Sequence, residues 1–367
     1  MKIVESTKIK EKAYFEKLEN GLNVIIIPKK NTNKKYVIWG TNFGSIDNNF
    51  IMPDNGEEVK IPDGVAHFLE HKMFEQSNGT NSLDVLMALG LEANAYTTND
   101  HTAYLFECSN DKFYEGLDEL MDYVQNPYFT DENVEKEKGI IGQEIMMYDD
   151  DPGFQLYLNT MDCMYHKNAV KLDIAGTIDS ISKINPDILY KCYNTFYHPS
   201  NMTLVVCGDF EPQELLNEII KRLKNKNNQG KIKRIYEVED ETINKCDKKV
   251  EMEVSMPIFM IGYKDCIEDS EEIVKKHIAI EILLNMLLGK SSNLYKELYN
   301  SGKLISEPDF DYEFSKQYAH ILISGQSKDY NEIYKKIKEQ VNNYKNNGLD
   351  SEHFERIKRK IYGDYVS

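Results

Sequence analysis

The chain has 367 residues, 41% of them hydrophobic, with 44 basic and 61 acidic side chains and a formal net charge of −17. This length predicts two or three domains that each bury a core, and the composition excludes a disordered chain. The acidic charge and the lack of a long Lys/Arg block exclude nucleic acid as the expected partner.

Two features of the sequence bear on its cellular compartment. The N-terminal residues lack the apolar core of a signal peptide, and no apolar run reaches about 18 residues, so we predict a cytoplasmic protein without a membrane span. The six cysteines follow no C-x-x-C spacing, which predicts reduced, buried thiols that are neither ligands nor disulfides. They are Cys108, Cys163, Cys192, Cys207, Cys246 and Cys266.

The first predicted elements are strands. Residues 13 to 28 predict a hairpin, because two β-prone runs flank the turn Asn20-Gly21, and residues 35 to 45 predict the next strand. A polar loop follows. Pro62-Asp63-Gly64 then supplies a turn, with the carboxylate of its second residue as the N-cap of a helix.

The helix predicted over residues 63 to 75 carries the main candidate site, His67-Phe-Leu-Glu70-His71. Each residue turns about 100° around a helix axis, so the two imidazoles and the Glu70 carboxylate share one face. We expect the opposite face to pack against a core, because it is apolar. That face consists of Val65, Phe68, Leu69 and Met73.

Two histidines at positions i and i+4 can chelate one metal ion, and the glutamate between them can hold a metal-bound water. This order, H-x-x-E-H, is the signature of inverted zinc peptidases. A surface helix with two histidines, or a histidine pair hydrogen-bonded inside a core, has the same spacing. A third ligand elsewhere in the chain is needed to separate these alternatives.

A second helix, predicted over residues 130 to 148 with Thr130 as its N-cap, carries two further acids. Glu137 and Glu144 are two turns apart and so face the same way. A solvated helix face has the same pattern. Before it, the sequence predicts a short helix, a hairpin turned at Asn99-Asp100 and a longer helix, over residues 82 to 89, 91 to 108 and 110 to 126.

Glu144 follows His71 by 73 residues, and with this spacing the chain resembles the pitrilysin/insulinase family of inverted zinc peptidases, as a bacterial, processing-peptidase-like member. The resemblance implies that His67, His71 and Glu144 hold one Zn²⁺ ion. It implies that Glu70 is the catalytic residue. It also implies that Glu137 supports the site from behind the ligands.

The resemblance gives a role to the first strand of the second hairpin as well. It implies that this strand, at Asn94 and Ala95, receives the peptide substrate as an added strand beside the zinc. Backbone pairing to a sheet edge holds an extended peptide with little dependence on its side chains. An ordinary hairpin strand is the alternative.

The next elements complete a first domain. We predict helices and a strand over residues 153 to 166, 179 to 197, 202 to 208 and 211 to 224. The composition then turns to Asn, Lys, Asp and Glu, which is typical of a linker. The predicted organisation is a zinc-bearing domain over residues 1–225, a linker over 226–249 and a second domain over 250–367.

The second half of the chain repeats the first. Residues 320 to 333 align with residues 104 to 117, and the helices after them align as well, which indicates a duplicated domain. Ile357 and Asp364 stand at the two glutamate positions, so the second domain is metal-free. We predict an α+β fold of two homologous domains, each a mostly antiparallel sheet with helices packed on one face, the second incomplete at its C-terminus.

The resemblance implies a zinc endopeptidase that cleaves peptides or unfolded segments by attack of a metal-activated water. Active family members often carry a substrate-binding Arg and Tyr in the second half, where Tyr299 and Ser306 stand here. We therefore expect a paralogous partner subunit that supplies them. The alternative is a non-catalytic binding or assembly subunit. A structural zinc site is disfavoured, because Glu70 would have no reason to lie beside the metal.

Overall fold

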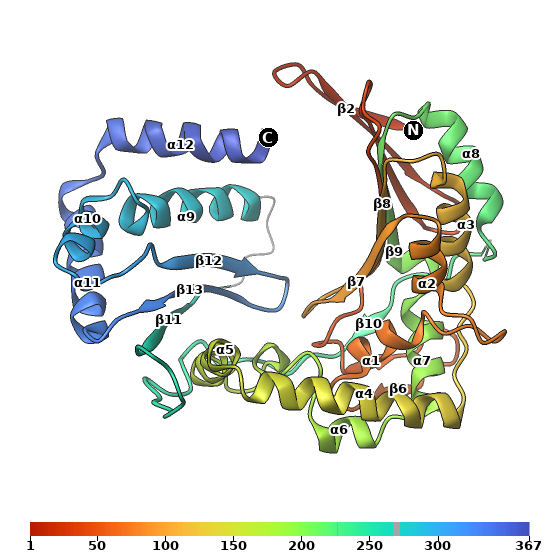
Figure 1. The fold of residues 1–367 in the computed structure, drawn as a ribbon, viewed down its shortest axis with the longest axis horizontal. Helices are drawn as coiled ribbons and strands as arrows, with labels where there is room; N and C mark the ends of the chain where they lie inside the picture. Colours follow the sequence, from red (N-terminus) through yellow and green to blue (C-terminus); the bar gives the residue numbers. More distant parts are fainter. Residues whose placement is uncertain (226, 267–271, 367) are drawn as a thin grey trace. The chain divides into compact units, whose positions relative to one another are not determined.

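The computed structural model describes residues 1–225, 227–266 and 272–366 (Figure 1). The chain forms two compact units: Met1–Met146 with Leu172–Tyr236, and Met147–Lys171 with Glu237–Ser367. Residues 147–171, predicted to belong to the first domain, are thus part of the second unit, and the predicted linker is divided between the units. Residues 226 and 367, at predicted boundaries, lie outside the described residues.

The first unit is built on a seven-stranded sheet in the order β1-β2-β3-β9-β4-β8-β7. The bounds are β1 Lys2–Ser6, β2 Glu11–Lys17, β3 Asn23–Pro28, β4 Lys35–Thr41, β7 Glu92–Thr97, β8 Thr102–Cys108 and β9 Met202–Gly208. All neighbours pair antiparallel except β3 and β9. The hairpins β2–β3 and β7–β8 are confirmed. Strand β1 was not predicted, because its residues are almost all exposed and show no apolar alternation.

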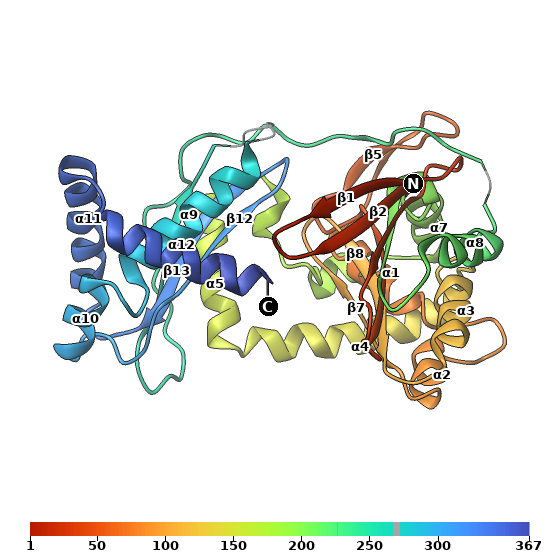
Figure 2. The same ribbon diagram turned by 90° about the horizontal axis from the view of Figure 1, so that it is seen from above.

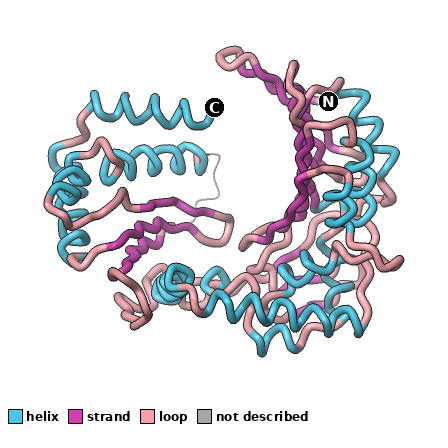
Figure 3. Tube along the Cα trace, viewed as in Figure 1, coloured by secondary structure: helices cyan, strands magenta, loops and turns pink. Residues whose placement is uncertain are grey.

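Helices cover one face of this sheet (Figures 1 and 3). They are α1 Val65–Lys72, α2 Ser82–Ala88, α3 Phe113–Tyr123, α4 Asp131–Asp149, α6 Ile178–Ser182, α7 Pro186–Phe196 and α8 Pro212–Arg222. Trp39, Tyr104 and Phe106 of the sheet are fully buried against them. The predicted apolar face of α1 is confirmed, since its four residues are all buried in this core.

The start of α1 differs from the prediction, because Asp63 does not cap it. Gly64 is the N-cap, with a φ of 91°, and no side chain closes the cap. The Asp63 carboxylate instead accepts a hydrogen bond from the Asn48 amide at 3.3 Å. A Cβ on Gly64 would lie 2.4 Å from the carbonyl oxygen of Ala175. Glycine is therefore required where α1 begins.

Two other predictions about this unit are wrong. Residues 179–197 form two helices, α6 and α7, because Asn185 caps α7 and Pro186 opens it. The predicted polar loop contributes to a small sheet, in which β5 Asn49–Ile51 pairs with β6 Glu58–Lys60 and with β10 Lys233–Arg234. Strand β10 comes from the predicted linker, so the linker has regular structure.

The second unit contains a three-stranded antiparallel sheet in the order β11-β13-β12. Its elements are α5 Pro152–Met164, β11 Ile258–Lys264, α9 Ile273–Leu288, α10 Asn293–Asn300, β12 Asp309–Phe314, β13 Ala319–Gln326, α11 Tyr330–Asn347 and α12 Ser351–Val366 (Figure 2). Leu288, Ile323 and Ile333 lie in its core. The run β13-α11-α12 repeats the order of β8-α3-α4. The two α+β units confirm the predicted fold class.

Two further observations concern the helices and the cysteines. Among the described residues, no helix combines the length and the hydrophobicity that crossing a membrane requires. All six cysteines are free thiols, but Cys246 and Cys266 are exposed. The prediction of buried thiols holds for Cys108 and Cys192, whereas Cys163 and Cys207 are only partly buried. It is wrong for Cys246 and Cys266, which lie in polar segments.

Candidate metal centre

Helix α1 presents His67, Glu70 and His71 on one side, because its apolar side is fixed in the core. The two imidazole rings lie 4.6 Å apart between their centroids. Their side chains are 13% and 26% exposed, respectively. The predicted pairing of two histidines on one helix face is confirmed.

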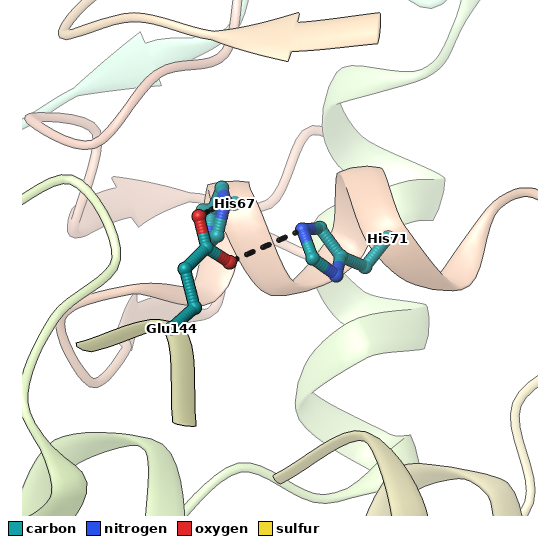
Figure 4. Close-up of side chains that lie close together, drawn as sticks. All are labelled: His67, His71 and Glu144. Atoms are coloured by element: carbon teal, nitrogen blue, oxygen red, sulfur yellow. Dashed lines mark ion pairs between the residues drawn. The ribbon is translucent and has the colours of Figure 1, made fainter. Parts of the chain in front are cut away.

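Helix α4 brings Glu144 to both imidazoles (Figure 4). Its Oε1 lies 3.8 Å from Nε2 of His67, and its Oε2 lies 3.7 Å from Nε2 of His71. One ligand atom from each residue lies within 4.8 Å of the other two. In the part of the chain that the structure describes, no other group of three His, Cys, Asp or Glu side chains does so. We call these three residues the ligand triad.

The donor atoms of the ligand triad fit a zinc ion. Separations of 3.7 and 3.8 Å are too long for hydrogen bonds between the imidazoles and the carboxylate. Ligands about 2.0–2.1 Å from a tetrahedral zinc lie about 3.3 Å from one another, which is close to the observed spacing. Two imidazole nitrogens and a carboxylate oxygen also form the donor set of catalytic zinc sites that keep a fourth position open.

Burial and charge set the protonation of the two histidines. Burial, together with the charge of His71, lowers the pKa of His67 to about 4. For His71, burial acts to lower the pKa, but the hydrogen bond and charge of Glu137 outweigh it and raise the pKa. The neutral imidazole is the form that binds a metal, so His67 is ready for metal binding at neutral pH.

Glu137 lies behind His71, on the side away from Glu144. Its Oε1 is 3.0 Å from Nδ1 of His71. A proton on Nδ1 satisfies this contact and leaves Nε2 directed at Glu144. Burial acts to raise the pKa of Glu137, but His71 and Lys72 outweigh it and lower the pKa, so the carboxylate stays an acceptor.

Glu70 is a further chemically useful group of the site. It is 8% exposed, and burial raises its pKa. The Oγ1 of Thr97, on β7, donates a hydrogen bond to its Oε2 at 2.6 Å. The charge of His71 acts to lower the pKa of Glu70, and the charge of Glu144 acts to raise it. A buried carboxyl with a raised pKa is suited to accept a proton and to return it.

Strand β7, which carries Asn94 and Ala95, forms the edge of the sheet. The N–H of Thr98 donates to the carbonyl of His101 at 2.8 Å. In an antiparallel ladder, hydrogen-bonded and non-hydrogen-bonded residues alternate along each strand. The N–H and C=O groups of residues 93, 95 and 97 therefore point away from β8, towards the open edge of the sheet. The N–H of Ala95 donates to Oδ1 of Asn94 at 2.9 Å. The outward groups can pair with an added strand.

Two residues of this site were not predicted from the sequence. Lys72 is fully buried and contacts Glu137. It lies four residues after Phe68 and seven after Val65, so its place on the buried face of α1 was a usable signal. For Thr97, the resemblance places β7 beside the zinc, but no local pattern in the sequence directs its hydroxyl at Glu70.

Two protein-family models match the chain. The model described as "Insulinase (Peptidase family M16)" matches residues 57–178, which include the ligand triad and Glu70. The model described as "Peptidase M16 inactive domain" matches residues 183–361.

Individual proteins match over most of the chain. The uncharacterized zinc protease YmfH of Bacillus subtilis is 42% identical over 323 residues, which are 87% of this chain and 74% of that protein. An M16-like peptidase from Alicyclobacillus acidocaldarius has a TM-score of 0.92 at 34% identity, over 99% of this chain and 85% of its own. A protease from Helicobacter pylori shares the fold, with a TM-score of 0.79 at 20% identity, over 97% of this chain and 85% of its own.

Proposed function

Because the chain belongs to the pitrilysin/insulinase family of peptidases (M16), we propose that it is a zinc-dependent endopeptidase. The observation that carries this proposal is the convergence of His67, His71 and Glu144, with the buried carboxyl of Glu70 beside them. A zinc site that only stabilised the fold would need no such carboxyl. The names of the relatives as zinc proteases support the same activity.

The mechanism assigns each residue a task. The ligand triad would hold zinc, which would lower the pKa of a water molecule and polarise a peptide carbonyl. Glu70 takes a proton from the water as the water oxygen attacks the carbonyl carbon. Glu70 then gives this proton to the amide nitrogen, and the C–N bond breaks. Thr97 holds Glu70 in position, and Glu137 holds His71.

The proposed substrate is an extended peptide that pairs with β7. The outward backbone groups at residues 93, 95 and 97 offer main-chain hydrogen bonds, which an unfolded segment can accept and a folded domain cannot. The side-chain Oδ1 of Asn94 accepts a hydrogen bond from the N–H of Ala95, and this bond breaks when the peptide pairs with β7.

A partner subunit of the same family is the second part of the proposal. Tyr299 and Ser306 stand where an Arg and a Tyr for substrate binding are expected, and Tyr299 is half exposed on α10. A paralogous chain would supply both groups. The same two positions favour the second candidate function, a non-catalytic binding or assembly subunit that keeps the peptidase fold.

The test measures zinc content and the cleavage of a quenched, unstructured peptide by the protein alone and with a paralogous chain. We expect about one zinc per chain. Glu70→Gln should keep the zinc and lose at least about 100-fold in kcat. Glu135→Gln is the control, because this carboxylate on α4 is 74% exposed.

Each other result has a distinct meaning. Zinc without cleavage, alone and in the mixture, would favour the assembly subunit. Retained turnover in the Glu70→Gln variant would overturn the assignment of the base, and absence of bound zinc would overturn the metal site.

A further inference from the structure

A buried lysine next to the second histidine has no task in the mechanism above. Lys72 is 0% exposed, although lysine is almost never fully buried unless it is paired. Its position, one helical turn after Phe68 and two after Val65, is on the face of α1 that packs in the core. An apolar side chain would fill this position without the desolvation of a charge. The groups that pair with this charge therefore indicate why a lysine stands here.

Two carboxylates partner Lys72. Its Nζ contacts Oε2 of Glu75, three residues along the chain, and lies 3.6 Å from Oε2 of Glu137 on α4. Glu137 uses its other oxygen, Oε1, for Nδ1 of His71 at 3.0 Å. One buried carboxylate therefore bridges a lysine and a histidine that are adjacent in the sequence, and each of its oxygens has its own partner.

We propose that Lys72 is a positioning residue of the metal site, which acts through Glu137 on His71. The inference rests on the proposed function, because it requires a metal at the ligand triad. The Glu137 carboxylate is attracted at Oε2 by the charge of Lys72 and bonded at Oε1 to His71, so its rotation is restricted. It thereby favours one ring plane of His71 and keeps the Nδ1 proton of that ring directed at Oε1. Nε2 then stays directed at Glu144.

The two histidines differ in whether a side chain is bonded to Nδ1. Among the described residues, none is a hydrogen-bond partner for Nδ1 of His67. The ring of His67 is buried without a hydrogen bond at Nδ1, whereas the ring of His71, which is more exposed, is bonded there by the Glu137 side chain. Removing the charge of Lys72 should therefore change the orientation of the His71 ring.

The test replaces Lys72 with methionine, which keeps the length of the side chain and removes its charge. We expect the affinity for Co²⁺, measured by competition with a chelator, to fall about 10- to 100-fold. The visible absorption spectrum of bound Co²⁺ should change, because the ring of His71 turns. Lys138→Met is the control: Lys138 follows Glu137 on α4 but pairs with the exposed Glu135. It should bind Co²⁺ as the unmodified protein does.

A second variant separates positioning from packing. If Lys72 acts through Glu137, adding Lys72→Met to Glu137→Gln should lower the Co²⁺ affinity by less than about twofold. The double variant removes both buried charges together, so it should fold even if Lys72→Met alone does not.

Two results would overturn the proposal while leaving the zinc peptidase intact. One is an unchanged Co²⁺ affinity and spectrum in the single variant, and the other is a further tenfold loss in the double variant. If the unmodified protein binds neither Zn²⁺ nor Co²⁺, the proposed function fails together with this inference.

Discussion

Thr97 is the side chain that links the sheet to the proposed base. Its Oγ1 lies 2.6 Å from Oε2 of Glu70 and 3.3 Å from Oγ1 of Thr102 on β8. Hydrogen bonds to an ionised carboxylate are short and strong, and they fix its orientation. A buried glutamate with one such donor therefore depends on it for its rotamer.

We expect Thr97→Val, which keeps the shape and removes the hydroxyl, to lower kcat about 10-fold with little change in KM. The base loses its orientation, whereas the backbone of β7 that pairs with substrate is retained. Thr97→Ser should restore most of the rate. Initial rates on a quenched peptide over a range of concentrations measure both constants, and an unchanged kcat in the valine variant would contradict the role of Thr97.

The residues of the site differ in how far the sequence could predict them. His67, Glu70 and His71 could be placed on one face because the geometry of a single helix fixes their directions. Glu144 came from a resemblance, since no local pattern connects α4 to α1. Lys72 could have been found, but its link to Glu137 depends on the packing of two helices, which the sequence of either helix does not contain.

Strand β7 is the element on which the substrate proposal depends. Proline at position 95 would remove only an outward-facing N–H and would leave the pairing with β8 in place, as on edge strands generally. We expect Ala95→Pro to raise KM about 10-fold with kcat nearly unchanged. Far-UV circular dichroism checks that the sheet is retained. A KM equal to that of the unmodified protein would exclude pairing of the substrate at Ala95.

The segment predicted to be a linker shows what composition cannot predict. Glu239 accepts the backbone N–H groups of residues 166, 167 and 168 at 2.8, 2.7 and 2.7 Å, and it pairs with Lys264 at 2.6 Å. Burial acts to raise its pKa, but these contacts outweigh burial and lower the pKa to about 2. A polar composition indicated a linker, because the three backbone partners of this carboxylate lie 71 to 73 residues away in the sequence and Lys264 lies 25 residues away.

Glu239→Gln should reduce the unfolding free energy by about 1–2 kcal/mol at pH 7, since solvent near the group weakens its contacts. The folded-state pKa is depressed from 4.5 to about 2. The stabilisation is therefore complete above the unfolded value and is lost as the pH falls toward 2. Urea unfolding should give a constant difference between the variant and the unmodified protein down to about pH 5, and a shrinking difference below it. An equal difference at pH 3 and pH 7 would contradict this account.

The whole chain combines two units with separate cores, and the ligand triad belongs to the first. The repeated order of elements was predictable, because aligned residues mark it. The sequence did not allow the prediction that residues 147–171 belong to the second unit. Helix α5 packs on β11 there, where a Cβ on Gly262 would lie 2.4 Å from Sδ of Met164. This contact joins segments about a hundred residues apart, and no local pattern indicates it.

Zinc should accordingly stabilise one unit selectively. A ligand that binds only the folded state at 100 times its Kd adds about 2.7 kcal/mol, which corresponds to about 5–10 °C for a unit of this size. We expect calorimetry of the chelator-treated protein to show two transitions, of which zinc raises only one. Glu144→Ala should abolish that shift, whereas Glu239→Gln should lower only the other transition.

Equal shifts of both transitions on adding zinc would show that the units unfold together. No shift at saturating zinc would show that the metal is not linked to the folding of the first unit, which would contradict a site built from two of its helices.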